Sequence, residues 1–232
     1  MKKLFEKNET LICMLLIAVY VVVNSYCLEN FGTTDYRSAL INGILMLIIF
    51  IFMLLLGRVS YYGLKKVTNS RKYLYFIPLI LIPLVNCWNG IKISNTSNEI
   101  LYHILTMISV GFLEEIIFRG FLFKMMEKSG LISAMLVSSL TFGIGHIVNL
   151  FSGADLTLTL MQICYSVAVG FLFVTIFHKS KRLWPCIITH AAINSLSIFY
   201  VETTKALYEA SIFLIVFSIV YSIYINIAVK EQ

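Results

Sequence analysis

Residues 39–57 read ALINGILMLIIFIFMLLLG, a long stretch without a single charged side chain. A helix that crosses the hydrocarbon core of a bilayer needs about 20 mostly apolar residues. Isolated strands cannot satisfy their backbone groups in lipid, so we expect an all-α fold, a polytopic transmembrane helix bundle with about eight spans. Apolar stretches of this kind recur along the chain, and they predict spans at residues 11–28, 39–57, 73–89, 100–126, 131–150, 157–177, 183–200 and 209–229.

The composition of the whole chain leads to the same fold class. Of its 232 residues, 59% are hydrophobic and 13% are charged. A soluble domain of this size cannot bury such an excess, because it must still cover itself with polar surface. The composition therefore excludes an ordinary soluble domain, a disordered chain and a secreted disulfide scaffold. We expect residues 1–232 to form a single integral membrane domain.

The net charge of +6 is unevenly distributed between the two sides of the predicted bundle. If the N-terminus is cytoplasmic, fourteen of the 18 basic residues lie in cytoplasmic segments and only Arg37, Lys92 and Lys205 lie outside. Cytoplasmic loops of membrane proteins carry an excess of Lys and Arg. We therefore predict that both termini are cytoplasmic. The positive charge is then an orientation signal, and we expect no nucleic-acid partner.

Three ionisable residues, Glu114, Glu115 and Arg119, lie inside the predicted span 100–126. Each such group within a membrane helix costs about 2.5–3.5 kcal/mol on insertion scales, so their presence indicates a buried functional site. Glu115 and Arg119 are four residues apart, share one helix face and are predicted to form an ion pair. Glu114 points about 100° away from Glu115. We therefore predict that Glu114 is the freer carboxylate.

Two histidines and one asparagine lie in later spans. His146 is in the span 131–150, and His190 and Asn194 are four residues apart in the span 183–200. Counted from the predicted cytoplasmic ends of these spans, the two histidines lie at depths that differ by about 12 Å. Small residues beside them would let helices approach closely; these are Gly143, Gly145, Ala191 and Ala192.

These residues are compatible with two hydrolytic mechanisms. In the first, Glu114 and His146 hold and deprotonate a water, while His190 and Asn194 donate hydrogen bonds to the oxyanion of an amide tetrahedral intermediate. In the second, Glu114, His146 and His190 bind Zn²⁺ and leave its fourth position open. A proton-coupled transporter also uses membrane carboxylates and histidines, and remains an alternative. The spacing of the residues does not distinguish among these three possibilities.

The ordered patterns EExxxR at 114–119, FxxxH at 142–146 and HxxxN at 190–194 resemble the three motifs of the CPBP (CAAX protease/Abi) family. That family consists of CAAX-prenyl-protease-like intramembrane proteases. The resemblance covers roughly residues 100–200, which we expect to form the catalytic core. It implies an intramembrane endopeptidase whose residues have these roles: Glu114 and His146 activate water, His190 and Asn194 form the oxyanion site, and Glu115 and Arg119 support the architecture.

The resemblance also bears on cofactors and partners. Members of the family are described both as metalloendopeptidases and as glutamate-dependent proteases. We favour the hypothesis of a metal-free mechanism, which needs no cofactor. Zinc bound by Glu114, His146 and His190 is the alternative. We expect the bilayer and a peptide or membrane-protein substrate as partners, such as a bacteriocin or a receptor. The role that the resemblance implies is bacteriocin self-immunity or the processing of membrane proteins and peptides, and the implied location is the bacterial plasma membrane. A non-catalytic immunity or interaction protein is a further alternative.

Overall fold

The computed structural model describes residues 2–65, 70–151 and 153–230, and within these residues it contains helices and no strand. Six helical segments are long and apolar enough to cross a membrane. Two shorter apolar segments, Leu74–Cys87 and Trp184–Phe199, lie where the third and seventh spans are predicted. The predicted all-α, polytopic bundle is thereby confirmed. The six long segments are Glu9–Phe31, Tyr36–Leu55, Ser97–Glu127, Leu131–Leu150, Leu156–Ser180 and Thr204–Ala228.

Several of these segments consist of more than one helix type. The N-terminal and central elements are α1 (Lys2–Lys7), α2 (Glu9–Phe31), α3 (Tyr36–Leu55), η1 (Ser70–Ile80), α4 (Leu81–Leu84), η2 (Val85–Cys87), α5 (Ser97–Glu114), η3 (Glu115–Phe123) and α6 (Lys124–Glu127). The remaining elements are α7 (Leu131–Gly145), η4 (His146–Leu150), α8 (Leu156–Ser180), α9 (Trp184–Leu196), η5 (Ser197–Phe199) and α10 (Thr204–Ala228).

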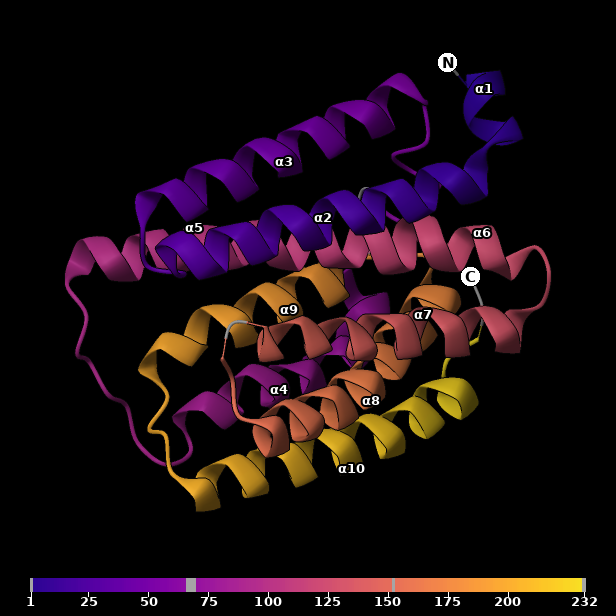
Figure 1. Cartoon of the computed structure of the whole chain (residues 1–232). Helices are drawn as coiled ribbons and strands as arrows, with labels where there is room; N and C mark the ends of the chain where they lie inside the picture. The colour runs from indigo at the N-terminus through magenta and orange to yellow at the C-terminus, as the bar shows by residue number, and fades with distance from the viewer. Residues whose placement is uncertain (1, 66–69, 152, 231–232) are drawn as a thin grey trace.

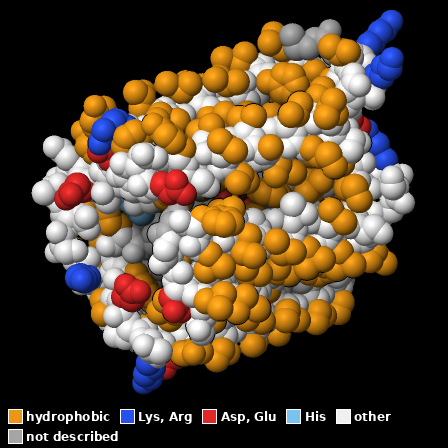
Figure 2. Space-filling model, viewed as in Figure 1, with side chains coloured by type: hydrophobic (Ala, Val, Ile, Leu, Met, Phe, Trp, Pro, Cys, Tyr) orange, Lys and Arg blue, Asp and Glu red, His pale blue; other side chains and the backbone are white. Residues whose placement is uncertain are grey.

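The long segment made of α5, η3 and α6 runs through the interior of the bundle. In Figure 1 it lies between α2 and α3 on one side and the group of α7, α8 and α10 on the other. Its most apolar window is 56% buried, whereas that of α2 is 17% buried. The outer helices therefore present apolar side chains to lipid, and Figure 2 shows hydrophobic side chains covering the flank, with charged side chains gathered toward the two ends.

Four helices begin at the same end of the bundle, and each has a polar side chain at its N-cap. The best defined is a capping box before α5, in which Thr96 Oγ1 accepts from the Glu99 N–H and Glu99 Oε2 accepts from the Thr96 N–H. Such caps satisfy backbone N–H groups that have no partner within the helix. The caps of α3, α8 and α10 are Asp35, Asp155 and Thr203.

Both chain termini lie at the opposite end of the bundle (Figure 1). An even number of crossings requires this arrangement, and it agrees with the predicted eight spans. The two ends of the molecule can therefore be distinguished as the termini end and the cap end, where α3, α5, α8 and α10 begin.

Candidate active site

A cavity of about 420 Å³ lies inside the bundle, and Glu114, His146, His190 and Asn194 all line it. The four residues come from α5, η4 and α9, which are separated by long stretches of sequence. The prediction that these four residues share one site is consistent with this placement. Their chemical roles remain predictions.

The predicted difference in depth between His146 and His190 does not keep them apart, because both line the same cavity. The reason lies before α9, where the link from α8 is buried: Leu183 is 0% exposed and donates its N–H to the Gly63 carbonyl, 3.1 Å away. The backbone of Gly63 has a φ of 83°, a conformation that favours glycine. The short helix α9 therefore starts inside the protein rather than at its surface, which places His190 deeper than counting from the loop predicts.

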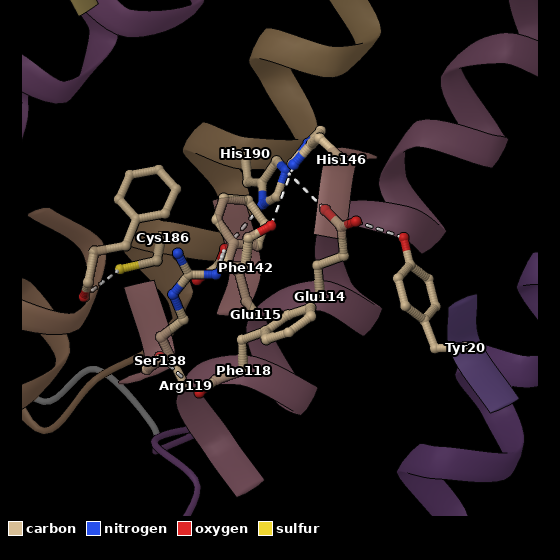
Figure 3. A network of polar contacts seen from close by, with 11 residues as sticks. Tyr20, Glu114, Glu115, Phe118, Arg119, Ser138, Phe142, His146, Cys186 and His190 are labelled. Atoms are coloured by element: carbon tan, nitrogen blue, oxygen red, sulfur yellow. Dashed lines mark hydrogen bonds and ion pairs between the residues drawn. The ribbon is translucent and has the colours of Figure 1, made fainter. Parts of the chain in front are cut away.

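The carboxylate of Glu114 has two side-chain partners (Figure 3). The Tyr20 hydroxyl donates a hydrogen bond to Oε1 at 2.6 Å, and His190 Nε2 lies 3.2 Å from Oε2. Tyr20 is 3% exposed and comes from α2, 94 positions before Glu114. No sequence pattern marked Tyr20, since a tyrosine inside an apolar span has no local signature of a functional role.

His190 lies between the two adjacent carboxylates. Its Nδ1 is 2.8 Å from Glu115 Oε1, while its Nε2 faces Glu114. A ring that donates to both carboxylates carries a proton on each nitrogen. In that state Glu114, Glu115, His190 and Arg119 together have no net charge, which is the arrangement least costly to bury. The sequence motifs did not indicate this bridge, because it joins α9 to the α5–η3 segment through space.

The predicted ion pair between Glu115 and Arg119 is confirmed. Arg119 Nη1 lies 3.1 Å from Glu115 Oε1, and both side chains are 0% exposed. The guanidinium carbon of Arg119 lies 4.2 Å from the centroid of the Phe142 ring, a cation–π contact. A Cβ atom on Gly170 would come within 3.1 Å of Arg119 Nη2, so the glycine makes room for the guanidinium. Gly170 therefore helps to accommodate the buried Arg119 side chain, and the motifs did not reveal this residue.

The helix changes type at the site. The sequence predicts one continuous helix over 100–126, but α5 ends at Glu114 and residues Glu115–Phe123 form a π-helix in which every residue is buried. π-Helical segments are rare in proteins, and many of those that do occur lie at functional sites. An apolar pattern does not separate i→i+4 from i→i+5 hydrogen bonding, because packing against neighbouring helices decides between them.

His146 is held by the end of its own helix. Its Nδ1 lies 3.2 Å from the carbonyl oxygen of Phe142 and 3.3 Å from that of Gly143. A hydrogen bond from Nδ1–H to a carbonyl fixes the proton on that nitrogen and leaves Nε2 as an acceptor. His146 is therefore suited to hold a water molecule in the cavity.

Close backbone contacts bring the site helices together. A Cβ atom on Gly111 would lie 2.8 Å from the Ala191 backbone nitrogen, so α5 and α9 touch one turn before Glu114 and directly beside His190. At Gly143 an added Cβ would lie 2.9 Å from the Val167 backbone nitrogen, which confirms the predicted close approach there. The same prediction is wrong for Gly145, where a Cβ would meet nothing within 4 Å.

The residues of the alternative zinc site are not arranged as a set of metal ligands. Among the residues that the structure describes, no group of three or more His, Cys, Asp and Glu side chains could hold a metal ion. Both ring nitrogens of His190 face carboxylates instead. Zinc binding through Glu114, His146 and His190 remains a prediction, and no step below is derived through it.

Comparison with known proteins adds independent information. Residues 96–196 match the family described as type II CAAX prenyl endopeptidase Rce1-like. A curated protein of Bacillus subtilis (strain 168), named "Putative membrane peptidase YdiL", is 37% identical over 93 residues, which make up 40% of this chain and 34% of that protein. The match thus spans about a third of the relative's length. No solved structure matches the chain.

The matched region contains every site residue that the motifs predicted, from Glu114 to Asn194, whereas Tyr20 lies outside it. The region also coincides with the predicted catalytic core at 100–200. The resemblance to the CPBP proteases is therefore confirmed: residues 96–196 of this integral membrane chain match the Rce1-like family of type II CAAX prenyl endopeptidases.

Proposed function

We propose that this chain is an intramembrane endopeptidase in which Glu114 is the general base. The observation that carries the proposal is the placement of the Glu114 carboxylate on the wall of a membrane cavity, between a tyrosine hydroxyl and a histidine ring. The match of residues 96–196 to a family of endopeptidases supports it. A general base must lie within hydrogen-bonding reach of the proton it removes, and a carboxylate that lines a cavity can reach a water there.

In the proposed reaction, a water bound between Glu114 and the acceptor nitrogen of His146 loses a proton to Glu114. The water oxygen then forms a bond to the carbonyl carbon of the substrate peptide. The resulting oxyanion accepts hydrogen bonds from the Asn194 side-chain amide and from the Nε2–H of His190, which is released from Glu114 once that carboxylate has taken up the proton. When the C–N bond breaks, the proton on Glu114 passes to the leaving amine, so that the carboxylate is regenerated.

Glu115 and Arg119 act in this scheme as positioning residues. Both are fully buried and do not line the cavity, so they cannot touch the substrate. Glu115 instead accepts from His190 at 2.8 Å and from Arg119 at 3.1 Å. The pair therefore sets the orientation of the His190 ring, as carboxylates do for histidines in other catalytic sites.

Under this proposal, the natural substrate is a peptide or a segment of a membrane protein. A bacteriocin or its receptor would belong to that class, and bacteriocin self-immunity is then one role that cleavage could serve. A non-catalytic immunity protein and a proton-coupled transporter are the alternatives, and neither would release a new peptide end.

The decisive experiment is hydrolysis in water enriched in oxygen-18. Purified protein in lipid vesicles is incubated with a panel of peptides, with and without a prenyl group, and products are analysed by mass spectrometry. We expect products in which the new carboxylate carries one heavy oxygen. Parallel reactions with a metal chelator, together with metal analysis of the protein, test the zinc alternative. Absence of cleavage across the panel, with the protein folded, would contradict the proposal.

Tyr20 is expected to contribute to the rate by holding Glu114. The change Tyr20→Phe removes one hydrogen bond to a charged group, an interaction of about 1.5–3 kcal/mol, so kcat should fall by about tenfold or more. The protein should remain folded, because the phenyl ring still fills the same space. Tyr26→Phe is the matched control, since Tyr26 lies on the same helix and is 54% exposed. Equal kcat values for the two variants would remove Tyr20 from the mechanism.

A further inference from the structure

The cavity that contains Glu114 extends toward one end of the bundle. On the side of the termini, its floor is made of the rings of Phe118, Phe142 and Phe173, all of which are at most 5% exposed. In the other direction its wall continues through residues near the ends of helices, among them Ser25, Asn149, Gln162 and Tyr200. These lie at the cap end, and Figure 2 shows the surface hollowed on that side of the molecule.

The wall between the site and the cap end is partly polar. Asn24 and Ser25 of α2 face this space, and across it the Asn149 amide donates a hydrogen bond to Gln162 Oε1 at 2.9 Å. Polar groups at this depth in a membrane protein are stable where they line a water-filled space. The same space supplies the water that hydrolysis consumes.

The basic residues identify which face of the membrane each end occupies. Within the described residues, the cap end carries Arg37, Lys92 and Lys205. The termini end carries many more, namely Lys2, Lys3, Lys7, Arg58, Lys65, Lys124, Lys128, Lys179, Lys181, Arg182 and Lys230. Lys and Arg accumulate on the cytoplasmic side of membrane proteins, so the termini end is cytoplasmic and the cap end faces outward.

From these two observations together we infer that the active-site cavity opens to the extracytoplasmic face of the membrane. Its substrates are accordingly peptides or protein segments exposed on that face, rather than segments that lie in the cytoplasm. The choice of substrate class rests on the proposed peptidase function, whereas the direction of the opening does not.

The inference can be tested by the reaction of introduced cysteines with a small, charged thiol reagent that does not cross membranes. The accessible natural cysteines are removed first by Cys87→Ser and Cys164→Ser, which leaves Cys13, Cys27 and Cys186 buried. Into this background one cysteine at a time is introduced by Ser25→Cys, Ser166→Cys, Ser129→Cys or Ser138→Cys, and the full chain is labelled in intact cells and again after permeabilisation.

The four positions form two matched pairs. Ser25 lines the cavity near the cap end, whereas Ser129 is exposed in the link between α6 and α7 at the termini end. Ser166 and Ser138 are both buried, at 4% and 0% exposure, but only Ser166 lines the cavity. We expect the cysteines at 25 and 166 to react in intact cells, the cysteine at 129 to react only after permeabilisation, and the cysteine at 138 to stay unreacted.

The reverse pattern, with position 129 reactive in intact cells and position 25 protected, would overturn the inference. Protection of position 166 under all conditions would also overturn it, because the cavity would then be closed to the outside. Labelling does not depend on catalysis. A protein that labels as expected but cleaves nothing would therefore refute the proposed function and leave the direction of the opening intact.

Discussion

The variant Glu114→Gln is expected to lose peptide hydrolysis by about 10²–10⁴-fold, the usual contribution of a general base. Glutamine keeps the size of the side chain and can still accept the Tyr20 hydrogen bond, which is 2.6 Å long in the native protein. It cannot take up a proton from water. The loss should therefore appear in kcat, while the protein folds and inserts as before.

The matched control for this variant is Glu127→Gln. Glu127 also pairs with a histidine, since His178 Nδ1 lies 3.1 Å from its Oε1, but this pair is at the termini end and does not line the cavity. We expect Glu127→Gln to retain activity in a peptide-cleavage assay in lipid vesicles. If both glutamine variants kept native kcat, Glu114 would not be the base; if both lost it equally, the assay would be reporting structural damage.

Arg119→Met is expected to be the most destabilising single change at the site. It removes one partner of a fully buried ion pair and leaves the cluster of Glu114, Glu115 and His190 with one uncompensated negative charge, which costs about 3–5 kcal/mol. The loss of the guanidinium also removes its contact with the Phe142 ring at 4.2 Å. The free energy of unfolding, measured by titration of the detergent-solubilised protein with sodium dodecyl sulfate, should fall by that amount.

Two further variants test whether the loss of stability comes from the burial of the ion pair or from the removal of an arginine as such. In Glu115→Gln/Arg119→Met both charges are gone, so much of the stability should return. Arg37→Met breaks an ion pair with Asp35 whose side chains are 48% and 25% exposed, and such surface pairs contribute about 0–1 kcal/mol. A similar free-energy change for Arg37→Met and Arg119→Met would show that burial of the Glu115–Arg119 pair has no special cost.

Most of the fold could be predicted from the sequence, because a helix that spans the bilayer is recognised from one continuous apolar stretch of the chain. Length and hydropathy alone place the apolar stretches, and the structure has helices at all eight predicted positions. The Glu115–Arg119 pair was equally predictable, since residues four apart on one helix are neighbours whatever the rest of the fold does. The ordered motifs also identified four of the residues that line the cavity, Glu114, His146, His190 and Asn194.

The remaining features depend on contacts between helices that are distant in the chain. Tyr20 reaches Glu114 from α2, and His190 bridges Glu114 and Glu115 from α9; neither contact has a local pattern. The π-helical turn after Glu114 and the direction in which the cavity opens likewise follow from packing. The sequence by itself determined which residues are costly to keep in a membrane, because that cost is local. Only the tertiary structure decided which partners offset it, because a hydrogen bond needs its two atoms within about 3 Å of each other.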